Sequence, residues 1–215
     1  MSELKYKYIA IEGNIGAGKT TLAKFLSTNL KGSLLLEEFE DNQFLKAFYQ
    51  GEDFAIHSEL QFILDRSRQL AEFFSKKHAL IFSDYVPQKS LIFSKINLTK
   101  TQFEVVDTLT KILYRPFKSP DLILFIERDV EDLIENIYKR GRSFEQQINE
   151  KYITSIMDGY ENWIKQLNQP VLRIRANQID MTKPEQLINS FYSILSEKYL
   201  QNEVKINLSE LMKVG

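Results

Sequence analysis

The 215 residues of this chain, 43% of them apolar and 27% charged, are enough to bury the core of one globular domain. The 28 basic and 29 acidic residues nearly balance, so no overall positive charge favours nucleic acid as a partner. The lack of cysteine excludes disulfides, thiolate metal ligands and cysteine nucleophiles. With no signal-peptide pattern and no apolar stretch near the roughly 20 residues of a membrane span, we expect a cytoplasmic protein without a membrane partner.

Short apolar runs alternate along the chain with longer segments of helical periodicity. Strands are predicted for the runs at 6–11, 33–38, 79–84, 121–126 and 171–176. Helices are predicted at 19–30, 54–77, 101–115, 129–139, 150–167 and 184–199. This alternation is typical of an α/β fold in which helices flank a parallel sheet, here of five strands. We expect residues 1–200 to form this single domain and 201–215 to form a tail or a short helix.

The first predicted strand leads into IEGNIGAGKTT, residues 11–21, which carries the P-loop pattern G-x-x-x-x-G-K-[ST]. Glycines let such a loop curl, so that unpaired amides at the start of the next helix converge on an anion. Lys19 would reach the outer phosphates, and the Thr20 hydroxyl would bind the Mg²⁺ that bridges them. We therefore predict that ATP, the phosphate donor, binds residues Gly13, Asn14, Ile15, Gly16, Ala17, Gly18, Lys19, Thr20 and Thr21.

The P-loop alone does not distinguish a GTPase, an ATP-driven machine and a small-molecule kinase. The guanine-reading sequence N-K-x-D of GTPases is absent. The run ALIFSD ends in Ser83 and Asp84, without the paired acids that are usual in ATP-driven motors. These two observations favour a kinase.

Three later stretches, together with the P-loop, resemble the deoxynucleoside kinase family, in particular its bacterial deoxyadenosine/deoxyguanosine kinase branch. They are LLLEEFEDNQFLKAFY, SDYVPQKSLIFSK and KRGRSFEQQI. The resemblance implies a P-loop fold with an arginine-rich lid, which uses ATP and Mg²⁺ to phosphorylate the 5′-hydroxyl of a deoxynucleoside in nucleotide salvage. It also implies a preference for purines and a homodimer built on helix faces, with 54–76 and 101–115 as candidates.

Two strand ends carry carboxylates that match the family. Glu37, with Glu38 beside it, stands where the family has the general base that acts on the 5′-hydroxyl. Asp84 matches an acid near Mg²⁺ and the substrate, and it would bind the metal directly or through water. The arginine that follows this acid in the family has no counterpart here. Lys89 is the nearest cation, and it is either a catalytic substitute for that arginine or a solvated loop lysine.

The stretch KRGRSFEQQ matches a mobile lid at about 140–148 that closes over the transferred phosphoryl group. Arg140 and Arg142 would stabilise the charge on its oxygens. Glu145 stands at the family's spacing for binding the sugar 3′-hydroxyl, and Tyr49 is the expected second partner of that hydroxyl. The resemblance therefore implies that this lid contributes both catalytic and substrate-binding residues.

The sequence FAIHSELQFILDRSRQL resembles the base-reading helix of the family. Arg66 matches an arginine near the base, and Glu59, where glutamine is common, shares a helix face with Phe62 and Arg66. The alternative is that Glu59 and Arg66 are ordinary surface charges. Gln61 is a rival base reader, and Phe62 and Phe93 are candidates to line the base. Because a carboxylate accepts two hydrogen bonds, Glu59 favours guanine, which presents N1–H and 2-amino donors.

Two other functions remain open from the sequence. One is a nucleoside monophosphate kinase of the thymidylate kinase type, and the other is a P-loop binding module without turnover, since the expected arginine is missing. A monophosphate acceptor arrives with an ionised oxygen and needs no base, so the carboxylate of Glu37 favours a neutral hydroxyl acceptor.

Overall fold

Parallel strands and crossover helices alternate in the computed structural model, which describes residues 3–38, 42–200 and 202–211. Within these residues one sheet contains β1 (Tyr8–Gly13), β2 (Ser33–Leu35), β3 (Ile81–Ser83), β4 (Leu122–Glu127), β5 (Val171–Arg175) and β6 (Glu203–Ile206). The strand order is β2-β3-β1-β4-β5-β6, and every neighbouring pair is parallel. This arrangement confirms the predicted α/β class.

The described part of the sheet has six strands, one more than the sequence predicted. The additional strand, β6, comes from the segment 201–215, and it pairs with β5 from Val171 to Ile174. The helix α9 (Leu208–Leu211) follows it, while residues 201 and 212–215 lie outside the described residues. A four-residue strand of alternating exposed and half-buried side chains gives only a weak sequence signal. Its backbone partners on β5 decide its conformation.

The helices that connect the strands are α1 (Lys19–Asn29), α2 (Gln43–Tyr49), α3 (Ala55–Phe74), α4 (Ser90–Asn97), α5 (Lys100–Tyr114), α6 (Val130–Arg140), α7 (Glu150–Ile164) and α8 (Pro184–Ser196). The sequence predicted all of these except α2 and α4. Those two have 7 and 8 residues, which is too short for helical periodicity to be recognised. Asn42 caps α2 through a bond from the Leu45 amide, and a capping box at Thr99 begins α5 directly after α4.

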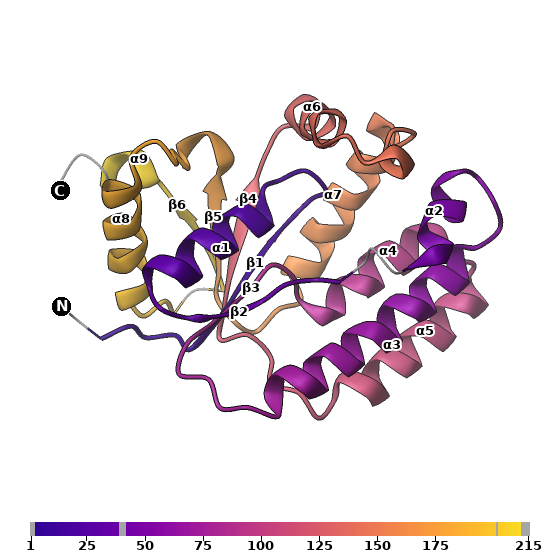
Figure 1. Ribbon diagram of the computed structural model, residues 1–215, viewed down its shortest axis with the longest axis horizontal. Coiled ribbons are helices and arrows are strands. Elements are labelled where there is room, and N and C mark those ends of the chain that lie inside the picture. Colours follow the sequence, from indigo (N-terminus) through magenta and orange to yellow (C-terminus); the bar gives the residue numbers. More distant parts are fainter. Residues whose placement is uncertain (1–2, 39–41, 201, 212–215) are drawn as a thin grey trace.

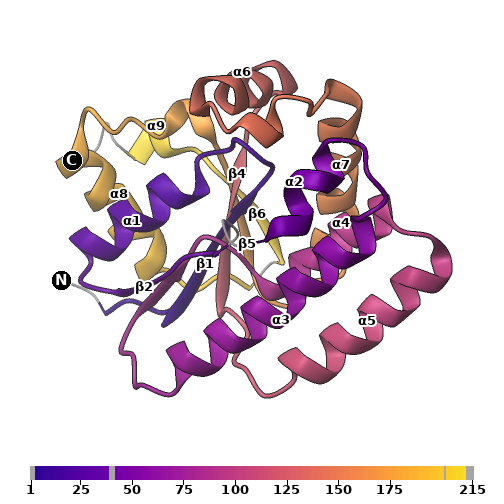
Figure 2. The same cartoon turned by 45° about the vertical axis from the view of Figure 1, so that its right-hand side comes forward.

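Helices cover both faces of the sheet (Figure 1). α1 and α8 pack on one face, and α7 and α4 pack on the other. Every residue of β1 is buried as a result, which is typical of a parallel sheet that is covered on both sides. α3 and α5 pack with the buried residues of β2 and the segment after β3, and Figure 2 shows them beside α4. None of the helices in the described part of the chain is long and apolar enough to cross a bilayer.

The carboxyl ends of β1, β2 and β3 lie next to one another because these strands are parallel neighbours. The phosphate loop follows β1, Glu37 follows β2, and Asp84 follows β3. Ligands of open α/β sheets bind at this edge. The fold therefore brings three separate sequence motifs to one place.

Candidate active site

The loop between β1 and α1 has the backbone that the P-loop pattern requires. Gly16 and Gly18 adopt left-handed conformations, with φ of 82° and 99°. A Cβ on Gly16 would lie 2.8 Å from the carbonyl oxygen of Leu133 in α6. Glycine is required at this position both for its conformation and for the close approach of another segment.

We expect Gly16→Ala to raise the Kd for ATP by about 5- to 150-fold, because a strained φ and a backbone clash together cost on the order of 1–3 kcal/mol. Equilibrium titration with ATP measures this effect, and thermal unfolding gives the accompanying loss of stability. Gly51→Ala is the matched control, because Gly51 also has a positive φ of 88° but has no atom within 4 Å of the added Cβ. Equal ATP affinities of the two variants would contradict the prediction.

Lys19 points into its own loop in this structure. Its ammonium donates to the carbonyl oxygens of Gly13 and Asn14 at 3.0 and 2.9 Å. Burial, together with the nearby charge of Lys89, lowers the pKa of Lys19 to about 8. The loop thus holds a cation that an anionic ligand would stabilise.

Thr20 and Asp84 form the part of the site that suits a metal ion. The Thr20 hydroxyl donates to Oδ2 of Asp84 at 2.5 Å, and Oδ1 accepts from the Glu37 backbone amide at 2.8 Å. In the described part of the chain, no group of three or more Asp, Glu, His or Cys side chains could hold a metal by itself. Two oxygen ligands fit Mg²⁺ that takes its other ligands from water and nucleotide phosphates.

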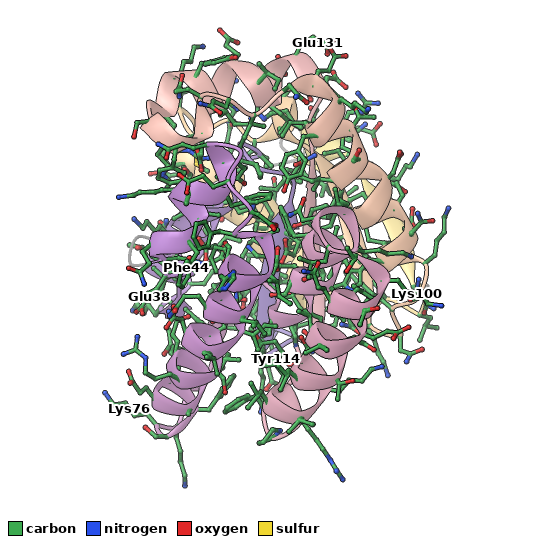
Figure 3. All side chains as sticks on the ribbon, turned by 90° about the vertical axis from the view of Figure 1, so that its right-hand side faces the viewer. Glu38, Phe44, Lys76, Lys100, Tyr114 and Glu131 are labelled. Atoms are coloured by element: carbon green, nitrogen blue, oxygen red, sulfur yellow. The ribbon has the colours of Figure 1, made fainter. Side chains whose placement is uncertain are left out.

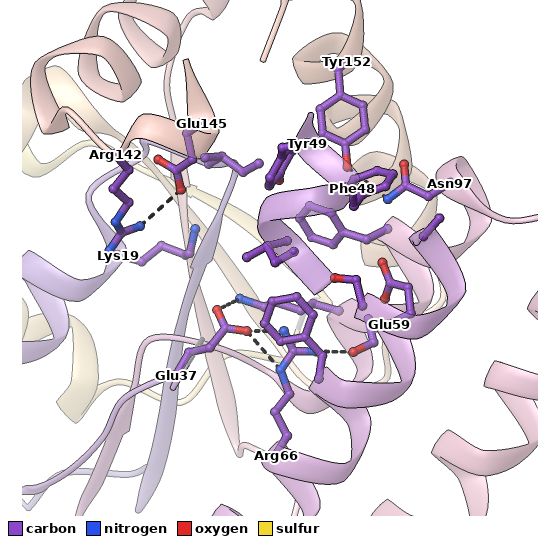
Figure 4. A pocket seen from close by; sticks show the side chains of 18 of the residues that line it. Lys19, Glu37, Phe48, Tyr49, Glu59, Arg66, Asn97, Arg142, Glu145 and Tyr152 are labelled. Carbon is purple, nitrogen blue, oxygen red and sulfur yellow. Dashed lines mark hydrogen bonds and ion pairs between the residues drawn. The ribbon is translucent and has the colours of Figure 1, made fainter. Parts of the chain in front are cut away.

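The Glu37 carboxylate lies between two cations (Figure 4). Arg66 donates to Oε1 through Nε at 3.0 Å and also through Nη2, while Lys89 Nζ lies 2.5 Å from Oε2. Burial acts to raise the pKa of Glu37, but Arg66 and Lys89 outweigh it and lower the pKa to about 2. Glu37 is therefore ionised at neutral pH and able to accept a hydrogen bond.

Both cations are buried, with 4% of Arg66 and 5% of Lys89 exposed. Arg66 is therefore no surface charge, and Lys89 is no solvated loop lysine. Tyr85 occupies the position after Asp84 where the family has an arginine, and its ring lies 5.8 Å from each cation. Positive charge thus reaches Glu37 from α3 and from the 3₁₀ turn Pro87–Lys89, not from the residue after Asp84.

A cleft of about 980 Å³, including its open mouth, extends from the phosphate loop to α3, α4 and α7. It brings together most of the predicted site residues. Those that line it are Ile15, Lys19, Thr20, Glu37, Tyr49, Glu59, Phe62, Arg66, Asp84, Lys89, Phe93, Arg140, Arg142 and Glu145.

Gln61 does not line this cleft, so the structure does not bring it together with Glu59, Phe62 and Phe93. Two positions after Glu59, a helical residue points about 200° further round the axis. The Gln61 side-chain amide donates instead to Oδ2 of Asp65 at 2.8 Å, one turn along α3.

Glu59 faces the cleft from α3 and is 6% exposed, so it is no surface charge either. Ser94 donates to its Oε2 at 3.0 Å, and Asn97 donates to the Tyr152 hydroxyl at 3.0 Å. Burial raises the pKa of Glu59 to about 7, although Arg66, Ser94 and Asn97 each act to lower it. Ser94 and Asn97 were missed by the sequence analysis because the helix that carries them, α4, was not recognised.

The lid arginines meet the carboxylate that was predicted to bind the sugar. Arg140 donates to Oε2 of Glu145 through Nε at 3.1 Å and Nη2 at 2.5 Å, and Arg142 Nη1 lies 3.3 Å from Oε1. Tyr49 is nearby, with its ring 6.2 Å from that of Phe144. These bonds hold both arginines against Glu145 in this structure.

Glu12 is a buried carboxylate next to the phosphate loop that the sequence analysis missed. Its carboxylate has no exposed surface and accepts from the Val86 amide at 2.6 Å and from the Tyr160 hydroxyl at 2.8 Å. Burial raises its pKa, against the opposing effects of Lys89 and Lys19. Glu12 thereby joins β1 to the segment after β3 and to α7. The sequence feature that could have identified Glu12 is a carboxylate within an otherwise apolar strand.

Known proteins with sequences similar to this chain contain the same type of fold and are kinases. The family model described as "Deoxynucleoside kinase" matches residues 9–199, which is most of the chain. The chain belongs to the deoxynucleoside kinase family. Among relatives of this kinase, the deoxyguanosine kinase of Bacillus subtilis (strain 168) is 33% identical over 186 residues, which cover 85% of this chain and 90% of that protein.

Two further relatives of this deoxynucleoside kinase match over most of their length. The deoxyadenosine/deoxycytidine kinase of Bacillus subtilis (strain 168) is 28% identical over 210 residues, 94% of this chain and 97% of its own. A solved deoxyadenosine kinase from M. mycoides, with dCMP and dCDP bound, is 26% identical with a TM-score of 0.74. The match covers 86% of this chain and 98% of that one.

Proposed function

We propose that this deoxynucleoside kinase transfers the γ-phosphoryl group of ATP to the 5′-hydroxyl of a deoxynucleoside, preferably a purine, in nucleotide salvage. The observation that carries this proposal is the position of Glu37. Its ionised carboxylate lies beside the phosphate loop and lines the same cleft as Glu59. A neutral hydroxyl must lose a proton when it attacks phosphorus, whereas a monophosphate oxygen has none to lose.

The donor half of the site consists of the phosphate loop, Lys19, Thr20 and Asp84. The loop amides and Lys19 would bind the phosphates of ATP, with Lys19 exchanging its bonds to loop carbonyls for bonds to phosphate oxygens. Thr20 and Asp84 would hold Mg²⁺, which neutralises phosphate charge when it is bound.

The acceptor half consists of Glu37 and the residues that hold it. Glu37 would orient the 5′-hydroxyl and take its proton as the bond to phosphorus forms. Arg66 and Lys89 fix the direction of the carboxylate through three contacts. Tyr49 and Glu145 would bind the 3′-hydroxyl, and Arg140 and Arg142 would move from Glu145 to the phosphoryl oxygens.

A panel assay tests this function: ATP and Mg²⁺ are supplied with each deoxynucleoside and each deoxynucleoside monophosphate in turn. We expect turnover of nucleosides, with purine deoxynucleosides having the highest kcat/KM. Faster turnover of monophosphates would instead identify a thymidylate-type kinase. Normal ATP binding with only trace turnover of every acceptor would identify a binding module.

We further propose that the kinase is a cytoplasmic homodimer formed through the outer faces of α3 and α5, which lie side by side (Figure 3). Leu64 on α3 and Val105 and Ile112 on α5 are 58%, 48% and 62% exposed. A contiguous exposed apolar surface marks protein–protein interfaces, and these three side chains would contribute to one. The molar mass in solution, and its decrease in an Ile112→Lys variant, test this proposal.

A further inference from the structure

Glu59 enters the cleft on the side opposite Lys19, as Figure 4 shows. The aromatic side chains of Phe62 and Phe93 line the same cleft and suit a flat nucleobase. A base placed there would meet a buried carboxyl group with little water to replace a missing hydrogen bond. Leaving a buried polar group unpaired is costly, so the base must match the hydrogen-bonding pattern of Glu59.

The surroundings of Glu59 leave part of its hydrogen-bonding capacity to a ligand. A carboxylate offers about four acceptor positions on its two oxygens. Ser94 uses one of them at Oε2, and Asn97 contributes a further hydrogen bond. The remaining positions are enough for two bonds along one edge of a base.

The pattern of hydrogen-bond donors and acceptors that a carboxyl group presents to a ligand depends on whether the group is protonated. The ionised form only accepts, which matches the N1–H and 2-amino donors of guanine. The protonated form presents one O–H donor and one acceptor, which matches N1 and the 6-amino group of adenine. A side-chain amide, in contrast, presents one donor and one acceptor at every pH.

The charged and titratable groups around Glu59 determine which of its two protonation states is favoured near neutral pH. The positive charge of Arg66 on α3 favours the ionised form of Glu59. The guanidinium of Arg66 is already bonded to Glu37, and the negative charge of Glu37 favours the protonated form of Glu59. Tyr49 on α2 and Tyr152 on α7 have pKa values that burial raises above the ordinary value, so both stay neutral near pH 7. Burial raises the pKa of Glu59 to about 7, with a smaller contribution from Glu37 and against the lowering effects of Arg66, Ser94 and Asn97.

We propose that Glu59 selects the purine base through its own protonation state, binding guanine when it is ionised and adenine when it is protonated. The inference rests on the proposed function and goes beyond it, because it makes base preference depend on pH in a single cleft.

The test is the ratio of kcat/KM for deoxyguanosine to that for deoxyadenosine, measured from about pH 6 to about pH 8. Ionisations that affect both reactions equally, such as that of Lys19, cancel in this ratio. If each base uses one form of Glu59, the ratio rises about tenfold per pH unit, as the ratio of ionised to protonated carboxyl does. Dissociation constants of the two nucleosides without ATP are expected to follow the same trend.

Glu59→Gln is expected to abolish the pH dependence of this ratio and to favour deoxyadenosine, because the amide mimics the protonated carboxyl. Glu72→Gln is the matched control, since Glu72 is an exposed residue on the same helix, and its ratio is expected to follow the wild type. Ser94→Ala removes a donor to the ionised form, so it is expected to lower the ratio at each pH while keeping the slope.

A wild-type ratio that is independent of pH, or a Glu59→Gln variant that keeps the slope, would overturn the inference even with full activity. The absence of phosphorylation with either nucleoside at every pH would contradict the proposed function instead. Because the wild-type slope needs no variant, the test does not depend on the folding of Glu59→Gln.

Discussion

Glu37→Gln is expected to lower kcat by roughly 10² to 10⁴-fold and to leave the affinity for ATP nearly unchanged. Glutamine keeps the shape of the side chain and one acceptor oxygen but cannot take the proton of the 5′-hydroxyl. The change also removes the counter-charge of two buried cations, Arg66 and Lys89, so some loss of thermal stability is expected. Steady-state kinetics, ATP titration and thermal unfolding separate these effects.

Glu38→Gln is the control for this prediction. Glu38 is the next residue, and its side chain is 64% exposed and only 3.9 Å from a similarly exposed Arg68. A surface pair of this kind contributes little to stability. If the Glu38 variant lost activity and the Glu37 variant kept it, the reaction would stand but the base would be the neighbouring carboxylate. Full activity of both variants would contradict base catalysis at this strand end.

Lys89→Met is expected to lower kcat by roughly 10²-fold with little effect on ATP binding. The ammonium holds Oε2 of Glu37 at 2.5 Å and would add positive charge beside the phosphoryl group. Both effects matter most in the transition state, where the proton moves and charge develops on the phosphoryl oxygens. Arg66 still holds Oε1 in the variant, so the effect should be smaller than that of losing the carboxylate.

Lys95→Met controls for the loss of a lysine, because Lys95 is an exposed residue on α4, which follows the turn that carries Lys89. Lys89→Arg asks whether a guanidinium can replace the ammonium, and it is expected to recover part of kcat. An unchanged kcat in Lys89→Met would show that this buried lysine only stabilises the fold. Parallel losses of kcat and of ATP affinity would place its effect in the donor half of the site.

The fold class followed from local patterns, because buried parallel strands and their crossover helices differ clearly in length and periodicity. Glu37 and Asp84 could be placed together because the carboxyl ends of the strands in a parallel sheet lie at one edge. The phosphate loop was recognisable because its chemistry requires glycines, a lysine and a hydroxyl at fixed spacing. Short elements such as α2, α4 and β6 escaped detection, because tertiary contacts decide their conformation.

The amino-acid sequence by itself determined the α/β domain, the phosphate loop, the carboxylates at the strand ends and the deoxynucleoside kinase family. Only the tertiary structure decided how the side chains pair. Glu37 is 29 residues from Arg66 and 52 from Lys89, and Ser94 is 35 from Glu59. Bonds across such separations depend on how α3 and α4 pack beside the sheet. The resulting pKa values depend on the burial that this packing creates, which no local pattern encodes.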